Sequence, residues 1–303
     1  MAKSLTVKGV PQPERLRVPL FPHQRANIYR METLERDKFS ILPGGDRLEG
    51  AIGILGDPPG TGKTLTILGL ICRDRMKCEG LIAENTMQTC SNIDGSLRIT
   101  RKVIFSRIKT TLIVTPLSIF HQWEKEIQSS DLTYKMIKQR SDISELEDYE
   151  VAICTINMYN SVAEKYANVS FKRFVYDEMD SAYIANMAQV NACFTWFVSA
   201  TFDSVLGEIN RSRKIHYMKR LFMNILSDFY SRESLLNSIT ITSTEKLRNL
   251  RPVPMNFESK YYVVRRAPVV VALRHHMDVD LVGMIDAGNI KDCLLYTSPS
   301  PRD

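Results

Sequence analysis

The sequence predicts an α/β fold in which helices cover both faces of a parallel β-sheet. Short apolar runs at 51–55, 111–115, 151–155, 174–177 and 196–199 have the length and composition of buried parallel strands. Segments with helical spacing of apolar residues separate them, and such alternation builds βαβ units. A glycine-rich loop directly after the first run places a phosphate-binding loop in this sheet.

The elements of the first third follow from local patterns. A helix is expected after residue 22, because Ile28, Met31 and Leu34 share one helical face. A turn at 43–46 precedes the strand at 51–55, and the glycine-rich loop leads into a helix through about Arg73. The polar stretch 74–108 is expected to be an irregular insertion or surface excursion.

The later elements alternate more regularly. The strand at 111–115 leads into a helix that carries Ile119, Trp123 and Ile127 on one face. This register favours a core role for Trp123 over base stacking. Segment 205–230 is expected to be an amphipathic helix with a basic face, and 238–242 and 261–264 to be strands.

Bulk composition limits the partners, the cellular location and the metal content that can be expected. The 303-residue chain has a net charge of +6, a mild lean toward a polyanionic partner. It has no apolar run near the roughly 20 residues of a membrane helix, and its start lacks a signal-peptide core. We therefore expect an intracellular protein without a membrane partner. Its six cysteines form no CxxC pair, which argues for free thiols over a zinc cluster.

The segment Asp57-Pro-Pro-Gly-Thr-Gly-Lys-Thr64 carries the chemistry of polyphosphate binding. Backbone N–H groups of Gly60, Thr61 and Gly62 are expected to converge on phosphate oxygens. Lys63 can reach the β and γ phosphates, and Thr64 can offer its hydroxyl to Mg²⁺. These residues predict a bound nucleoside triphosphate with Mg²⁺, but a phosphate loop alone does not identify the nucleotide. Asp57 stands where this kind of loop usually has its first glycine.

Two acids end the apolar strand at 174–177. Asp177 is placed to hold hydrated Mg²⁺ together with Thr64, and Glu178 to orient and deprotonate the attacking water. Catalysis is thus assigned to Lys63, Asp177 and Glu178. The competing interpretation, acids that cap the next helix, loses weight because a phosphate loop lies upstream.

As a set, these segments resemble the superfamily 2 helicase-like motors, and among them the Snf2-like DNA translocases, over about residues 18–270. The most specific stretch is Pro116-Leu-Ser-Ile-Phe-His-Gln-Trp-Glu-Lys-Glu-Ile127. Leu20-Phe-Pro-His-Gln24 is similar to the adenine-contacting motif, and Val151–Tyr159 to a later motif. The resemblance implies that Gln24 contacts adenine and that nucleic acid contacts Pro116, Leu117, Ser118 and Thr155. It also assigns coupling to Ser199 and Thr201.

The resemblance implies a RecA-like lobe, with ATP bound between it and a second lobe that supplies arginine fingers. We expect lobe 1 at 1–204 and a helical extension toward the second lobe at 205–292. Residues 293–303 look like a translated sequencing adapter, so the second lobe is expected to be missing from this chain. The fragment alone is then expected to bind ATP weakly and hydrolyse it poorly.

The departures from the family leave alternatives open. Asp177-Glu-Met-Asp180 replaces the usual Asp-Glu-Ala-His, and Ser199-Ala-Thr201 replaces Thr-Gly-Thr. Large-DNA-virus helicases vary at these motifs, so a viral origin, with residence in the nucleus or a cytoplasmic factory, is expected. Duplex DNA is the expected partner. The alternatives are a DExD-type RNA helicase, with RNA as partner, and a non-catalytic nucleotide-gated subunit of a viral transcription complex.

Overall fold

The computed structural model describes residues 8–42, 44–77, 81–92, 95–180, 183–200 and 231–243, with backbone alone for 81–92, 95–103 and 232–233. All belong to the first of two compact units, Met1–Asn249, and the second, Leu250–Asp303, lies outside the described residues. The expected helix at 205–230, the strand at 261–264, and the tail at 293–303 also lie outside them.

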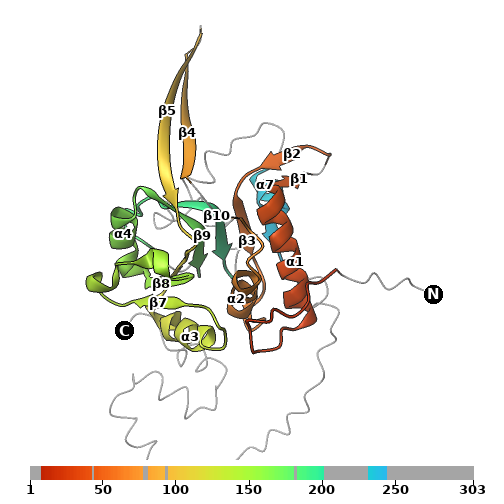
Figure 1. The fold of residues 1–303 in the computed structure, drawn as a ribbon. Coiled ribbons are helices and arrows are strands. Elements are labelled where there is room, and N and C mark those ends of the chain that lie inside the picture. Colours follow the sequence, from red (N-terminus) through yellow and green to blue (C-terminus); the bar gives the residue numbers. More distant parts are fainter. Residues whose placement is uncertain are drawn as a thin grey trace, which may run out of the picture. The chain divides into compact units, whose positions relative to one another are not determined.

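A mainly parallel sheet forms the centre of the described unit (Figure 1). Its path runs β11-β3-β10-β9-β6-β8-β7, and every neighbouring pair along this path is parallel. The strands are β3 (Ile52–Leu55), β6 (Thr111–Thr115), β7 (Tyr134–Ile137), β8 (Val151–Thr155), β9 (Val169–Asp177), β10 (Asn191–Val198) and β11 (Thr240–Ile241). All five strands predicted upstream of residue 200 are therefore confirmed.

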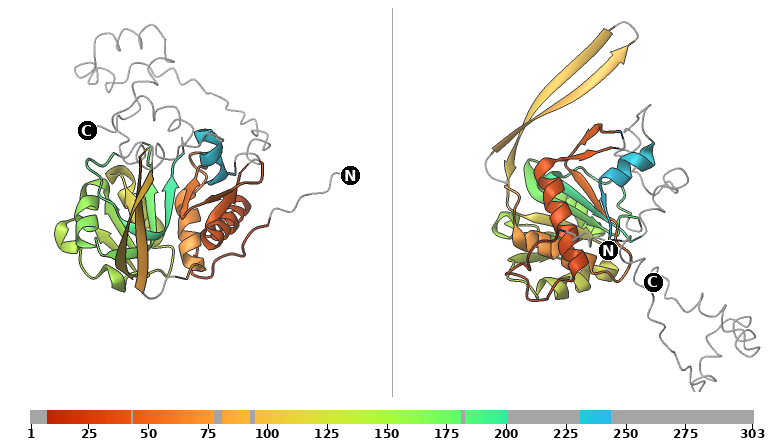
Figure 2. Two further views of the ribbon diagram at one scale, coloured as in Figure 1. Left: turned by 90° about the horizontal axis from the view of Figure 1, so that it is seen from above. Right: turned by 90° about the vertical axis from the view of Figure 1, so that its right-hand side faces the viewer.

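Helices cover both faces of this sheet, as Figure 2 shows. On one face α1 (Pro22–Asp37), α2 (Lys63–Arg73) and α3 (Leu117–Ile127) pack into a common apolar cluster. On the other face α4 (Ile156–Lys165) and Leu236 of α7 (Arg232–Ser238) join a second cluster. Two short 3-10 turns, η1 (Arg140–Asp142) and η2 (Leu146–Asp148), lie between β7 and β8. The predicted α/β class with two covered faces is confirmed.

Strand alternation divides the core between the two faces. In β6, Ile113 joins the cluster under α1–α3, whereas Leu112 and Val114 join the cluster under α4. Because both faces are buried, the strand is apolar throughout and reads as a continuous run in the sequence. No helix in the described ranges is long and apolar enough to cross a membrane.

The stretch 74–108 leaves the sheet as the predicted surface excursion, but its expected irregular structure is wrong. The segment forms a long antiparallel hairpin of β4 (Leu81–Asn92) and β5 (Gly95–Arg107), which reaches away from the sheet (Figures 1 and 2). The end of β5 pairs with β9, at Ser106↔Val169 and Arg107↔Ser170. Alternation of Leu97, Ile99 and Val103 with polar residues favours a strand, a two-residue period that the polar composition obscures.

Two further strand features complete the unit. β1 (Phe39–Ile41) and β2 (Arg47–Glu49) form a separate antiparallel pair after α1. β11 adds to the main sheet beside β3, within the predicted strand at 238–242. The sheet thus includes a strand beyond residue 204, in the segment that the sequence assigns to the extension.

A buried ion pair fastens α1 to the sheet. Arg173 of β9 donates from Nε and Nη2 to the two carboxylate oxygens of Glu35, at 2.6 and 2.8 Å. Trp196 of β10 donates to Oε1 of the same carboxylate at 2.9 Å. The side chains of Arg173 and Glu35 are only 1% and 2% exposed. Burial opposes the charge on Arg173, but Glu35 and Asp74 offset this, and its pKa is raised.

Candidate nucleotide-binding site

The predicted site residues follow the carboxyl ends of adjacent strands, where open parallel sheets bind ligands. The phosphate loop follows β3, and Asp177 ends β9. Pro116 follows β6, Thr155 ends β8, and Ser199 follows β10. Parallel pairing brings all five strand ends to one edge of the sheet. Thr201 lies outside the described residues.

The loop backbone has the conformation that the glycines were predicted to permit. Gly60 and Gly62 have φ of 77° and 80°, the left-handed region that side chains disfavour. A Cβ at Gly62 would lie 2.4 Å from Nε2 of Gln24. Thr61 donates its hydroxyl to the carbonyl of Pro58 at 2.7 Å, which closes the loop on itself. The positive φ therefore favours a glycine at Gly62, and a Cβ there would also displace the amide of Gln24.

Gln24 and His23 brace this loop from the start of α1. Gln24 Nε2 donates to the carbonyl of Gly62 at 3.0 Å, and Gln24 Oε1 accepts from the backbone N–H of Phe21 at 2.8 Å. His23 Nε2 lies 3.0 Å from the carbonyl of Thr61. Gln24 is buried. In this structure Gln24, the residue predicted to contact adenine, holds the phosphate loop. The contact made by His23 is not predicted by any pattern in the sequence.

Lys63 begins α2 and points into the loop. Its ammonium donates to the carbonyls of Asp57 and Pro58 at 3.1 and 3.4 Å. Thr64 is the second residue of the helix and is partly buried. Because the helix N-terminus and the lysine both carry positive charge, this end of α2 favours an anion.

Asp177 and Glu178 form the acidic side of the site. Asp177 Oδ2 accepts from Trp123 Nε1 at 2.7 Å, and Oδ1 accepts from the backbone N–H of Glu178 at 3.0 Å. Burial raises the pKa of Asp177 to about 6, although the hydrogen bond from Trp123 and the positive charge of Lys63 both lower it. Burial also raises the pKa of Glu178; the nearby charge of Asp180 adds to this, and that of Lys63 opposes it.

The backbone at Glu178 is strained. Its φ is 51°, the left-handed region that non-glycine residues seldom adopt. Such strain costs on the order of 1–3 kcal/mol and gathers at functional sites. The conformation turns the chain sharply after Asp177, so the two consecutive acids do not continue the alternation of the strand. The conformation thus places Glu178 in a tight turn at the end of β9.

Asp57 has a structural role that the sequence did not predict. Its carboxylate is fully buried and accepts from Asn27 Nδ2 of α1 at 2.6 Å. It also accepts from the backbone N–H and the hydroxyl of Ser243, at 2.6 and 2.7 Å. The carbonyl of Ile241 accepts from Gly56 N–H beside it. Asp57 therefore ties the start of the phosphate loop to α1 and to the chain that follows β11.

Replacing Asp57 with glycine, the usual residue at this loop position, is expected to destabilise the fold by about 1–3 kcal/mol. The change leaves the Asn27 amide and the Ser243 N–H without their buried acceptor. Urea unfolding of Asp57→Gly and of Asp57→Asn measures the effect, and the asparagine should lose less because it keeps one acceptor. Unchanged stability of Asp57→Gly would show that these hydrogen bonds contribute no net stability.

The predicted nucleic-acid contacts divide into exposed and buried residues. Leu117 is 61% exposed, and Ser118 is exposed. Pro116, which precedes them and follows β6, is the N-cap residue of α3. Thr155 pairs in register with Thr115, so it lies beside this exposed turn, but it is itself buried. Ser199, assigned to coupling, is buried and donates its N–H to the carbonyl of Leu55 at 3.2 Å.

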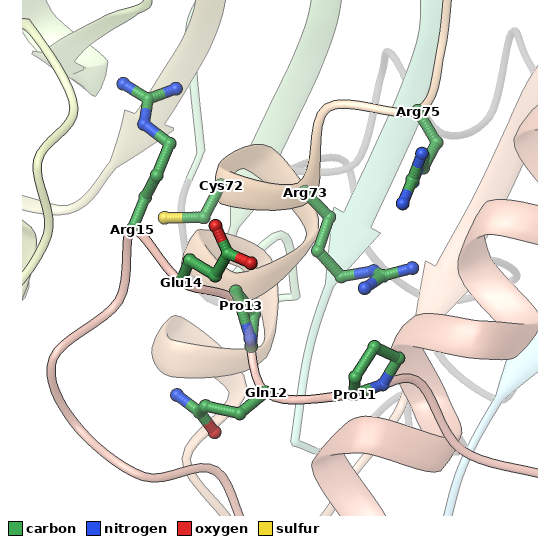
Figure 3. Close-up of a pocket in the computed structure, with 8 residues that line it drawn as sticks. All are labelled: Pro11, Gln12, Pro13, Glu14, Arg15, Cys72, Arg73 and Arg75. Carbon is green, nitrogen blue, oxygen red and sulfur yellow. The ribbon is translucent and has the colours of Figure 1, made fainter.

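Two cavities lie away from this edge, at the other end of α2. One, of about 290 Å³, is lined by Pro11, Gln12, Pro13, Glu14, Arg15, Cys72, Arg73 and Arg75 (Figure 3). The second, of about 620 Å³, is lined in part by Arg73, Arg75 and Lys77. The 11 residues of α2 span roughly 16 Å, which separates both cavities from Lys63. Neither is the predicted nucleotide site.

The residues present fit a magnesium nucleotide. A glycine loop with positive φ at Gly60 and Gly62 leaves its backbone open to phosphate oxygens. Lys63 supplies a cation, and Asp177 supplies a buried carboxylate at the same edge of the sheet. Bound Mg²⁺ would supply charge neutralisation for a transferring phosphoryl group. Lys63 would hold phosphate oxygens, Asp177 the hydrated metal, and Glu178 the proton of an attacking water.

Comparison with known proteins agrees with this geometry. The SNF2-related domain family matches residues 23–197. The DNA repair protein RAD5 of Kluyveromyces lactis is 28% identical in an alignment of 180 residues that covers 50% of this chain and 15% of RAD5.

A solved structure shows the same fold. The SWI2/SNF2 ATPase core of Sulfolobus solfataricus, in complex with double-stranded DNA, superposes with a TM-score of 0.50 at 15% identity. The match covers 78% of this chain and 46% of the archaeal one, so the chain spans less than half the length of either relative. The family match covers more than half of the residues of this chain. The chain therefore belongs to the SNF2-related domain family.

Proposed function

We propose that this chain carries the ATP-binding lobe of a motor that hydrolyses ATP with Mg²⁺ and moves along duplex DNA. The observation that carries the proposal is the convergence of Lys63, Asp177 and Glu178 at one sheet edge, in a chain of the SNF2-related family. The charge of Lys63 acts on both carboxyl groups, as expected of groups that share one bound phosphate and metal.

Hydrolysis by this lobe is proposed to need a second lobe, which supplies arginine to the transferred phosphate. The relatives support DNA as the partner, since one is named a DNA repair protein and the other is bound to double-stranded DNA. They are fungal and archaeal, so the viral origin and the intracellular location stay predictions of the sequence.

The exposed turn 116–118 is the proposed contact with the DNA backbone. Replacing Leu117 with glutamate adds a negative charge where phosphates are expected, and should weaken duplex binding several-fold at low salt. Ile41→Glu is a matched control, because Ile41 is 59% exposed against 61% for Leu117 and lies beyond the far end of α1.

Fluorescence anisotropy with labelled duplex DNA and single-stranded RNA, in the presence of a magnesium–ATP analogue, tests both the partner and the contact. The proposal expects tighter binding of the duplex and a loss in Leu117→Glu alone. Tighter binding of RNA would favour the DExD-type RNA helicase instead. Equal losses in Leu117→Glu and Ile41→Glu would remove turn 116–118 from the interface.

A further inference from the structure

Trp123 is tied to the acid that the proposed function assigns to Mg²⁺. It lies in the second half of α3, is 1% exposed, and donates Nε1–H to Asp177 Oδ2 at 2.7 Å. The opposite oxygen, Oδ1, accepts from the backbone N–H of Glu178. The sequence placed Trp123 in the core, which is confirmed, but a core role alone does not require its ring nitrogen to meet a buried carboxylate.

These two donors fix the plane of the Asp177 carboxylate. The terminal torsion of aspartate is broad, so a carboxylate without partners samples many orientations. One donor on each oxygen removes this freedom, while each oxygen keeps a lone pair for a water or a metal. An indole always donates and never carries charge. Trp123 therefore orients the acid without neutralising it, which a lysine or arginine at the same place would do.

We propose that Trp123 is a positioning residue that holds the Asp177 carboxylate ready for the magnesium ion of the bound nucleotide. This inference rests on the proposed function and adds a residue to its site. It explains why an apolar helix face carries a tryptophan at this position, where a phenylalanine would be apolar but could not donate a hydrogen bond. Groups that hydrogen-bond to metal-binding residues typically change metal affinity by about 10- to 100-fold when they are removed.

The chain provides its own control. Its two tryptophans are both fully buried, and each donates Nε1–H to a buried carboxylate: Trp123 to Asp177 at 2.7 Å and Trp196 to Glu35 at 2.9 Å. Glu35 pairs with Arg173 and is not among the site residues. Trp123→Phe and Trp196→Phe thus remove similar volumes and similar bonds, but only the first touches the proposed metal-binding acid.

The test follows the two indole N–H signals by ¹H–¹⁵N NMR while Mg²⁺ and ADP are added to the 303-residue chain. The signal that remains in Trp196→Phe belongs to Trp123, so the assignment does not depend on the folding of Trp123→Phe. We expect Mg²⁺ with ADP to shift the Trp123 signal more than ADP in EDTA does, and to leave the Trp196 signal in place.

A second readout is the Mg²⁺ concentration needed for half-maximal ADP binding. It should rise about tenfold in Trp123→Phe and stay unchanged in Trp196→Phe. If the wild type binds ADP with Mg²⁺ but the Trp123 signal does not respond and the Mg²⁺ requirement is unchanged, the inference fails while the proposed function stands. If the wild type binds no nucleotide at all, the proposed function and the inference both fail.

Discussion

Replacing Arg173 with methionine is expected to remove about 3–5 kcal/mol from the free energy of unfolding. The change leaves the carboxylate of Glu35 buried between α1 and the sheet, with Trp196 as its one remaining donor among the residues that the structure describes. An unpaired buried charge loses its hydration without compensation, so the loss greatly exceeds that of an exposed pair. Urea unfolding measures it, and a thermal midpoint lower by roughly 10 °C should accompany it.

Arg15→Met is the matched control, because Arg15 also forms a two-bond pair with a glutamate, Glu150, but its side chain is 37% exposed. A partly exposed pair is expected to contribute only about 0–1 kcal/mol. The double variant Glu35→Leu/Arg173→Met should recover much of the loss, since no unpaired charge remains. Equal losses in Arg173→Met and Arg15→Met would contradict the description of the Arg173–Glu35 pair as a buried anchor.

Replacing Asp177 with asparagine is expected to change stability and metal-dependent binding in opposite directions. The pKa of Asp177 is raised from 3.8 to about 6 in the folded chain, so its ionised form costs stability. That cost is fully present above about pH 6 and disappears as the pH falls toward the unfolded value. Asp177→Asn should therefore be more stable at pH 8, by on the order of 1–3 kcal/mol, and the difference should vanish near pH 4.

The same substitution should raise the Mg²⁺ concentration needed for nucleotide binding by about 10- to 100-fold, since a carboxylate that holds the hydrated metal is lost. Unfolding at pH 4 and pH 8, together with Mg²⁺ titrations in the presence of ADP, checks both effects. Asp148→Asn is the control, as Asp148 is exposed and lies in η2. A variant that lost stability at pH 8 and kept its Mg²⁺ requirement would show that Asp177 serves the fold and not a metal.

The sequence predicted those parts of the structure that local patterns determine. Apolar runs such as 111–115 and 151–155 are parallel strands in the structure. They can be recognised because a strand that is buried on both faces is apolar throughout. The ends of these strands then brought Lys63, Asp177 and Ser199 to one edge, as the topology of parallel sheets requires.

Contacts between distant residues could not be predicted in this way. Trp123 and Asp177 are 54 residues apart, and Asp57 and Ser243 are 186 apart. Each contact depends on how an element packs on the sheet, which spacing within the element does not show. The sequence shows Asp57 only as an acid at a glycine position, whereas its carboxylate joins three segments of the lobe.

The central claim is that Lys63 belongs to a magnesium–nucleotide site, and calorimetric titration of the chain with ATP tests it most directly. The wild type should bind ATP at one site with Mg²⁺ and much more weakly in EDTA. Lys63→Ala should lose about 2–3 kcal/mol of binding free energy, a fall in affinity of roughly 30- to 150-fold. The control Lys77→Ala, an exposed lysine beyond the far end of α2, should bind as the wild type does. Equal affinities of Lys63→Ala and the wild type, or binding that does not depend on Mg²⁺, would contradict the account.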